Sequence, residues 1–260
     1  MTTFEAIILG LVQGLSEFLP VSSSGHLVLA QSLLGLAHEG LVFEVVVHVA
    51  TLVSVLAFYH RRVGELVVGV LRGRADAWRY GMKLVVASLP AVVVVLLFGA
   101  FFEAQFESMA VVGLSLLLTG WMLWTTQRSA PHARLEEPSW LAALGIGCAQ
   151  ALAILPGISR SGATVAAALA LGVRPVAAAE FSFMMSVIAI TGAAVRLLMN
   201  FEPVTEAQAS ALLWGGMVAL VSGIGAIWLF VQLLRGQAFH RFAYYTWAVG
   251  GGILAWLLLT

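Results

Sequence analysis

The stretch Pro20-Val21-Ser22-Ser23-Ser24-Gly25 divides the first apolar part of the chain, residues 4–37, into two short pieces. A second break, Pro156-Gly157-Ile158-Ser159-Arg160-Ser161-Gly162, divides residues 139–173 in the same way. Each piece is shorter than the roughly 20 apolar residues that a helix needs to cross the hydrocarbon core of a bilayer. A short helix, an irregular break and a second short helix are typical of a re-entrant hairpin, whose break must be satisfied by protein or by a water-filled cavity.

The composition is that of a polytopic membrane protein. Of the 260 residues, 61% are hydrophobic and 10% are charged, whereas charged residues make up about a quarter of an ordinary soluble domain. These values exclude a soluble globular enzyme and a disordered chain. The 13 basic residues balance 13 acidic ones, so no basic excess is left for a nucleic-acid backbone. The single cysteine excludes an internal disulfide and a cysteine-based zinc site.

Six further stretches are apolar and long enough, or nearly so, to span the membrane. They are residues 43–59, 84–102, 108–126, 177–199, 207–234 and 242–260. Arg and Lys gather in the loops 60–83, 127–138 and 235–241, while the intervening loops carry Glu without Lys or Arg. The positive-inside rule places the basic loops in the cytoplasm. Both termini are then periplasmic, and the two hairpins enter the membrane from opposite faces.

An internal repeat agrees with this topology. Pro20 and Pro156 are separated by 136 positions, and so are Glu44 and Glu180. Each half consists of one hairpin followed by three spans, and an odd number of crossings makes two such repeats inverted. The sequence therefore predicts an all-α integral membrane protein with six transmembrane helices plus two re-entrant helical hairpins in an inverted-topology internal repeat. Residues 1–260 form one polytopic domain, with repeat 1 at about 1–126 and repeat 2 at about 139–260.

The first hairpin carries groups suited to catalysis. Charged side chains inside membrane spans are rare and costly, which makes each of them a candidate functional residue. Gln13 and Glu17 are four positions apart and share one helix face. The break that follows supplies Ser22, Ser23, Ser24 and His26. A carboxylate, a hydroxyl cluster and an imidazole are the groups that nucleophilic or general acid–base chemistry requires.

The second hairpin has the features of an anion site. Arg160 presents a permanently charged planar fork that suits phosphate oxygens. Ser159, Ser161 and Thr164 add hydroxyl donors, and a helix that starts at this break exposes backbone N–H groups to an anion. If the two tips meet, the cavity is suited to phosphoryl transfer, which depends mainly on positioning and charge neutralisation. A hard divalent ion held by Glu17 and phosphate oxygens fits the same cavity.

The two breaks also carry a family resemblance. The runs Gln13-Gly14-Leu15-Ser16-Glu17-Phe18-Leu19-Pro20-Val21-Ser22-Ser23-Ser24-Gly25-His26 and Pro156-Gly157-Ile158-Ser159-Arg160-Ser161-Gly162-Ala163-Thr164 resemble the two signature motifs of the BacA/UppP undecaprenyl-diphosphatase family. The runs Phe43-Glu44-Val45-Val46 and Ala179-Glu180-Phe181-Ser182-Phe183 resemble it as well. The resemblance implies a bacitracin-resistance phosphatase of the bacterial inner membrane. Such an enzyme hydrolyses undecaprenyl diphosphate to undecaprenyl phosphate at the periplasmic face, recycles the lipid carrier for peptidoglycan synthesis, and depends on Mg²⁺ or Ca²⁺.

The resemblance also implies roles for individual residues. Glu17 matches a metal-binding or catalytic carboxylate, Ser23 a nucleophilic serine, and Arg160 a phosphate-binding arginine. His26 matches the motif histidine, which acts as nucleophile or as acid/base, so the nucleophile stays open between Ser23, His26 and water. The residues expected to bind substrate are Gln13, where many members have Glu, and Ser22, Ser24, Ser159, Ser161 and Thr164.

Other interpretations remain beside these. Glu17 and Arg160 also suit a structural ion pair that holds the hairpins together, and one or more of the serines suits a helix N-cap. Glu44 and Glu180 are expected to accept hydrogen bonds from the hairpins, and His48 to be a core histidine. A transporter or flippase of an anionic lipid is the alternative function, because inverted repeats with broken helices are typical of transporters and a fold alone does not decide function. The sequence leaves a homodimer open.

Overall fold

The computed structural model describes residues 1–36, 41–199 and 205–259, and these residues are almost entirely helical. One isolated β-bridge joins Leu135 to Val173. The helices are α1 (Thr3–Phe18), α2 (Ser23–Leu33), α3 (Leu41–Phe58), α4 (His60–Leu71), α5 (Ala75–Gln105), α6 (Met109–Ser129), α7 (Trp140–Leu152), α8 (Arg160–Ala170), α9 (Pro175–Met199), α10 (Glu206–Arg235) and α11 (Phe242–Leu259). Two short 3₁₀ helices, η1 (Ala130–His132) and η2 (Phe239–Arg241), precede the chain segments that lead into α7 and α11.

The protein is a multi-pass membrane protein, as its composition predicts. Within the described part of the chain, five helices are long and apolar enough to cross a bilayer, and they lie in α5, α6, α9, α10 and α11. The sixth predicted span, residues 43–59, corresponds to α3, which meets the length requirement only together with α4. The α3–α4 pair is bent by 81° at Tyr59.

The predicted basic loop 60–83 is helical over most of its length. It contains α4, and α5 begins at Ala75, well before the apolar stretch that starts at residue 84. Val63 and Leu66 of α4 pack against the core, while Glu65 on the same helix is 67% exposed. A helix with an apolar side and a charged side can lie along the surface of the protein, so charge in a loop does not exclude helical structure.

The two predicted breaks each start a new helix with a serine cap. The backbone of Ser22 has φ +71° and its Oγ accepts a hydrogen bond from the Gly25 N–H at 3.3 Å. Ser159 caps α8 in the same way, accepting from the Gly162 N–H at 3.0 Å. Such caps satisfy amide donors that have no partner in the first turn of a helix. The prediction that a serine of the first break is an N-cap is confirmed.

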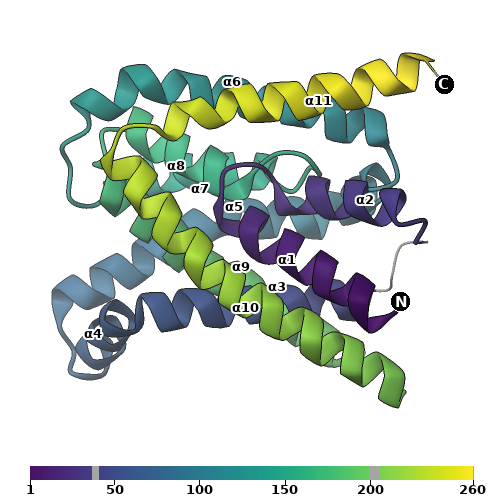
Figure 1. The fold of residues 1–260 in the computed structure, drawn as a ribbon. Helices are drawn as coiled ribbons and strands as arrows, with labels where there is room; N and C mark the ends of the chain where they lie inside the picture. Colours follow the sequence, from purple (N-terminus) through teal and green to yellow (C-terminus); the bar gives the residue numbers. More distant parts are fainter. Residues whose placement is uncertain (37–40, 200–204, 260) are drawn as a thin grey trace.

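The turn between α1 and α2 meets the turn between α7 and α8 in the interior of the protein (Figure 1). The Gly157 N–H donates to Ser22 Oγ at 3.1 Å, and Ser161 Oγ donates to the Leu19 carbonyl at 3.4 Å. Gly157 has φ +93°, and a Cβ there would lie 2.5 Å from the Val112 carbonyl oxygen. Only glycine therefore allows the turn between α7 and α8 to lie this close to α6.

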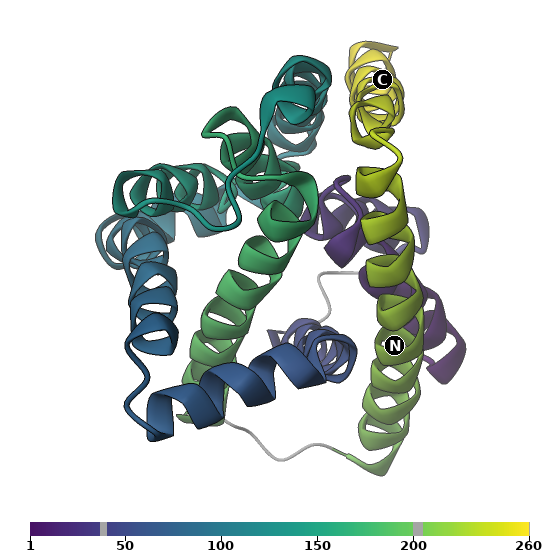
Figure 2. The same cartoon turned by 90° about the vertical axis from the view of Figure 1, so that its left-hand side faces the viewer.

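The two ends of the molecule differ in the segments that they carry. Both chain termini and the turn between α5 and α6 lie at one end, while α4 and the turn between α10 and α11 lie at the other (Figure 1). Viewed from the second end, α9 runs between α5 and α10 (Figure 2). The hairpin α1–α2 has its turn directed toward the α4 end, and α7–α8 has its turn directed toward the end of the termini.

Small residues bring the helices of the bundle close together. A Cβ on Gly10 of α1 would lie 2.2 Å from the Gly215 carbonyl of α10, and a Cβ on Gly147 of α7 would lie 2.4 Å from the Ala87 carbonyl of α5. Helices in membranes associate through such close backbone contacts. The aromatic rings of Phe18, Phe183 and Phe230 pack against one another in the core and connect α1, α9 and α10.

Candidate functional site

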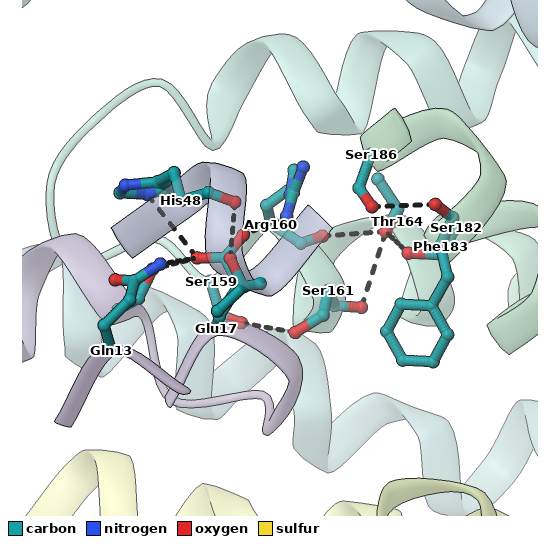
Figure 3. Close-up of polar contacts among 12 residues, drawn as sticks. Gln13, Glu17, His48, Ser159, Arg160, Ser161, Thr164, Ser182, Phe183 and Ser186 are labelled. Atoms are coloured by element: carbon teal, nitrogen blue, oxygen red, sulfur yellow. Dashed lines mark hydrogen bonds and ion pairs between the residues drawn. The ribbon is translucent and has the colours of Figure 1, made fainter. Parts of the chain in front are cut away.

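An ion pair joins the two hairpins at their tips. Glu17 lies in the last turn of α1 and is 6% exposed, and Arg160 is the first residue of α8. The Arg160 Nη2 atom donates a hydrogen bond to Glu17 Oε1 (Figure 3). A buried carboxylate needs such a partner because an unpaired buried charge is strongly unfavourable. The ion pair that the structural interpretation predicts is therefore present, and it leaves a functional role open.

The remaining carboxylate oxygen of Glu17 accepts two hydrogen bonds. Ser23 Oγ donates to Glu17 Oε2 at 2.6 Å, and Gln13 Nε2 donates to the same oxygen at 3.0 Å. Ser23 is the first residue of α2, so the left-handed backbone of Ser22 determines the position of its hydroxyl. A serine hydroxyl bonded to a carboxylate in this way has a base in place to accept its proton.

A cavity of about 380 Å³ lies beside these groups. Glu17, Ser22, Ser23, Ser24, Ser159 and Arg160 line it, together with Ser16, Glu44, Val45, His48, Phe106, Ala153, Ile154, Ile158, Ala189 and Ile190. The first turns of both α2 and α8 therefore border the cavity, and helix N-termini attract anions. Phe106 follows α5 in the turn at the end of the molecule that carries both termini, so the cavity extends toward that end.

Two of the predicted substrate-binding residues instead connect helices. Thr164 Oγ1 is hydrogen-bonded to Ser182 Oγ of α9 at 2.6 Å and donates to the Arg160 carbonyl at 2.7 Å (Figure 3). Ser161 bonds the Leu19 carbonyl in the opposite turn. Among the described residues, the cavity lining includes neither Ser161 nor Thr164. Gln13 is fully buried behind Glu17 and reaches the cavity only through that carboxylate.

His26 lies apart from the other predicted catalytic groups. Its Nε2 is 2.8 Å from the hydroxyl of Tyr245 on α11, and its Nδ1 is 2.8 Å from the Ser22 carbonyl oxygen. The described lining of the cavity does not include it. The expectation that all candidates of both hairpins share one cavity is therefore not met for His26, nor for Gln13, Ser161 and Thr164. For His26 the reason is that position 26 lies on the side of α2 that faces α11.

His48 lies at the site although the sequence favoured a role in the core. Its Nε2 is 3.6 Å from Glu17 Oε2, and its Nδ1 is 2.7 Å from the Glu44 carbonyl, so it lines the cavity beside Glu44. One signal pointed to this arrangement, because Glu44 and His48 are one turn apart on one face of a single helix. The packing of α3 against α1 was not visible in the sequence.

Glu180, which follows Glu44 by 136 positions, lies elsewhere and has different partners. Its Oε1 accepts hydrogen bonds from Arg62 Nε at 2.7 Å and from the Tyr80 hydroxyl at 3.4 Å. These contacts connect α9 to α4 and α5 rather than to a hairpin turn. The expectation that Glu180 accepts hydrogen bonds from a hairpin is wrong, because a cationic partner on α4 is available to it.

The protein side chains at the site supply few ligands for a metal ion. No group of three or more His, Cys, Asp or Glu side chains that could hold an ion occurs in residues 1–36, 41–199 and 205–259. Gln13 Oε1 is buried without a hydrogen-bond partner, and Glu17 is the nearest carboxylate. Mg²⁺ commonly binds through one or two carboxylates and completes its shell with water and substrate phosphates. The donor set fits an ion that binds together with a phosphate-bearing ligand.

Comparison with known proteins agrees with this site. A family model described as "Bacitracin resistance protein BacA" matches residues 6–252. The chain belongs to the BacA family. Proteins named undecaprenyl-diphosphatase from Carboxydothermus hydrogenoformans and Alkaliphilus metalliredigens are 39% and 36% identical to it. The first alignment covers 98% of this chain and 97% of the relative, and the second covers 100% of both.

The BacA family match includes both hairpins and every residue that lines the cavity. A relative of the same name from Methanobrevibacter smithii is 38% identical over 96% of each chain. The family resemblance predicted from the two serine-containing breaks is therefore confirmed. The match extends from α1 into α11, so it includes Tyr245 as well as the hairpins.

Proposed function

We propose that this BacA-family protein is a multi-pass membrane phosphatase that hydrolyses undecaprenyl diphosphate to undecaprenyl phosphate and inorganic phosphate. Its activity recycles the lipid carrier for peptidoglycan synthesis and contributes to bacitracin resistance. The names of its relatives support the substrate. The observation that carries the proposal is the hydrogen bond from Ser23 Oγ to Glu17 Oε2 at 2.6 Å. It lies beside the guanidinium of Arg160, in a cavity bordered by the N-termini of α2 and α8.

In the proposed reaction Ser23 is the nucleophile and Glu17 is the general base. Ser23 Oγ attacks the terminal phosphorus while its proton moves to Glu17 Oε2. The bond from that phosphorus to the bridging oxygen breaks, and its electron pair leaves with undecaprenyl phosphate. Water then attacks the phosphorylated serine. The P–Oγ bond breaks as Glu17 returns its proton to Ser23 Oγ, and the water proton is released to solvent or stays on inorganic phosphate.

Arg160 and the two helix N-termini bind the diphosphate in this proposal. The guanidinium has five N–H donors in a fixed fork, so it can keep one hydrogen bond to Glu17 while it donates others to phosphate oxygens. Ser22, Ser24 and Ser159 provide hydroxyls beside the same two helix N-termini. Preorganised donors aimed at the transferred phosphoryl group stabilise its transition state. Gln13, Ser161 and Thr164 contribute by holding Glu17 and the turns in place.

Glu17 is the residue that would hold a divalent ion, Mg²⁺ or Ca²⁺, together with oxygens of the bound phosphate. When bound, such an ion neutralises charge on the phosphate oxygens. Glu17 keeps its hydrogen bond from Ser23 in this scheme, because a carboxylate has about four lone-pair positions. Gln13 is buried behind Glu17 and orients its carboxylate through a hydrogen bond.

The membrane arrangement is part of the proposal. Six spans, with α3 and α4 as the bent one, and two re-entrant hairpins, α1–α2 and α7–α8, make two inverted repeats of about 1–126 and 139–260 in one domain. The positive-inside rule then assigns the α4 end, with Arg61 and Arg241 near it, to the cytoplasm of a bacterial inner membrane. The termini and the mouth of the cavity face the periplasm. A homodimer stays a prediction.

The first experiment measures phosphate release from undecaprenyl diphosphate by purified protein in detergent, with Mg²⁺, Ca²⁺ or EDTA. Metal-dependent release that is lost in Ser23→Ala and Arg160→Ala is the expected result. Thr205→Ala, a substitution at the α10 N-cap remote from the cavity, is the matched control. Absence of release from folded wild-type protein would contradict the phosphatase and favour the transporter alternative, which is measured by lipid movement across liposomes.

A further inference from the structure

Tyr245 of α11 is connected to the turn before Ser23 by a chain of hydrogen bonds that runs from its hydroxyl through the His26 imidazole to the Ser22 carbonyl. The Tyr245 hydroxyl lies 2.8 Å from His26 Nε2, and the two rings stack with centroids 5.7 Å apart and an interplanar angle of 13°. His26 Nδ1 lies 2.8 Å from the Ser22 carbonyl oxygen. Ser22 Oγ accepts from the backbone N–H of Gly25 and of Gly157. The Tyr245 side chain is thus linked by hydrogen bonds to the place where the two hairpins meet.

The partners of His26 fix which nitrogen carries its proton. A carbonyl oxygen can only accept, so the proton between His26 and Ser22 belongs to Nδ1. In the neutral ring Nε2 is then an acceptor, and the Tyr245 hydroxyl is its donor. Both ring nitrogens are therefore engaged away from the cavity. In this arrangement the imidazole has no lone pair or proton directed at a phosphorus atom beside Ser23.

The residue that His26 holds is conformationally strained. Ser22 has φ +71°, a left-handed conformation that a non-glycine residue adopts only when its surroundings enforce it. Two hydrogen bonds hold the Ser22 carbonyl, one from the His26 side chain at 2.8 Å and one from the His26 backbone N–H at 3.1 Å. The orientation of that carbonyl fixes the peptide plane that leads directly into Ser23. Rotation of this plane would move the Ser23 hydroxyl away from Glu17.

We propose that Tyr245 is a positioning residue for the reaction, acting through His26 and the Ser22 carbonyl to hold the Ser23 hydroxyl against Glu17, and that His26 serves in this relay rather than in the chemical step. This inference rests on the proposed phosphatase function. Its physical basis is that the rate of a preorganised reaction depends steeply on the position of the nucleophile, so that a displacement of about 1 Å costs about a hundredfold.

The experiment compares kcat and KM for phosphate release from undecaprenyl diphosphate in four variants of the full-length protein. Tyr245→Phe removes only the donated hydroxyl and keeps the ring. Loss of one hydrogen bond between uncharged groups corresponds to about three- to tenfold, so kcat falls by about that factor with KM unchanged. Tyr244→Phe is the matched control, because Tyr244 lies on the same helix as Tyr245 but packs against Trp124 of α6 and Trp247 of α11. It keeps wild-type kcat.

His26→Asn separates positioning from chemistry. The Asn amide nitrogen takes the place of Nδ1 and keeps the hydrogen bond to the Ser22 carbonyl, but it cannot titrate and has no atom at Nε2. The relay predicts that His26→Asn retains activity within about tenfold of wild type and leaves the shape of the pH–rate profile unchanged. In the His26→Asn background, Tyr245→Phe has no further effect, because the double-mutant cycle removes the same contact twice.

The outcomes distinguish a positioning role of His26 and Tyr245 from a role of His26 in the chemical step. Loss of activity of about a thousandfold or more in His26→Asn, the range seen when a nucleophile is removed, would overturn the relay and return His26 to the chemical step. Wild-type kcat in Tyr245→Phe, or equal effects of Tyr245→Phe and Tyr244→Phe, would overturn the role of Tyr245. A change in the shape of the pH–rate profile in His26→Asn or in Tyr245→Phe would also overturn the positioning role. An inactive wild-type protein would instead contradict the proposed function itself.

Discussion

Substitution of Arg160 is expected to reduce stability as well as activity. The side chain of Glu17 is 5% exposed and that of Arg160 is 20% exposed, so Arg160→Ala leaves a buried carboxylate without its cationic partner. Breaking a buried ion pair from one side costs about 3–5 kcal/mol. Ser23 and Gln13 still donate to Glu17, which favours the lower end, about 3 kcal/mol. In a chain of this size each 1 kcal/mol lowers Tm by about 2–4 °C, which gives a decrease of about 6–12 °C.

Thermal unfolding of the purified protein in detergent, followed by size-exclusion chromatography or tryptophan fluorescence, measures this decrease. Arg160→Lys is the matched control, since it keeps a cation but not the planar fork, and its Tm should lie nearer to wild type. The double variant Glu17→Gln/Arg160→Ala removes both charges and should be more stable than Arg160→Ala alone. A wild-type Tm in Arg160→Ala, or a double variant no more stable than the single one, would refute the reasoning. Phosphate release should fall by at least about a hundredfold in Arg160→Ala and in the double variant.

Three other predictions concern the metal, the turn and the topology. Wild-type protein should bind Mn²⁺ much more tightly when inorganic phosphate is present, because the described residues supply few metal ligands of their own. Electron paramagnetic resonance measures this binding, and Glu17→Gln should remove the gain in affinity. Equal affinity with and without phosphate would contradict the prediction. Gly157→Ala should lower the free energy of unfolding by about 1–3 kcal/mol, because a φ of +93° strains alanine and the added Cβ would meet the Val112 carbonyl of α6. An unchanged Tm would argue against this close contact between the turn and α6. A reporter fused after Thr260 should be active only if it functions in the periplasm, and activity of a cytoplasmic reporter there would reverse the proposed orientation.

Glu44 and Glu180, which are 136 positions apart, lie in different surroundings. Glu44 lines the cavity beside Glu17, whereas Glu180 is paired with Arg62 of α4 at the α4 end of the molecule. The difference follows from their neighbours, because α4 brings a cation to Glu180 whereas Glu44 lies beside His48 at the mouth of the cavity. The surrounding helices therefore decide what each glutamate contacts.

The spatial relation between the two hairpins explains why a break in each helix is retained. The turns bring Ser22 against Gly157 and Glu17 against Arg160, so each hairpin satisfies polar groups of the other. Exposed backbone donors and a buried charge would be costly in the protein interior without such partners. The first turns of α2 and α8 border the cavity beside these contacts.

The sequence alone determined the class of the protein and six of the residues that line the candidate site. Apolar length, low charge and two serine-containing breaks specified a helical membrane protein with paired short helices, because these properties depend on the bilayer and on local backbone chemistry. It also selected Glu17, Ser23 and Arg160, since a charge or a hydroxyl cluster inside an apolar stretch is visible without a fold. The predicted six spans are shown only in part, because five helices in the described residues are long and apolar enough and α3 qualifies only together with its bent continuation α4.

Only the tertiary structure decided which of these groups face one another. His26 and Ser23 are three residues apart, yet one contacts Tyr245 on α11 and the other contacts Glu17 on α1. His48 joins the site from α3, although sequence spacing gave no reason to bring it to Glu17. Both results follow from the rotation and packing of whole helices. That packing depends on contacts between distant small residues such as Gly10 and Gly215, and periodicity within one helix does not contain this information.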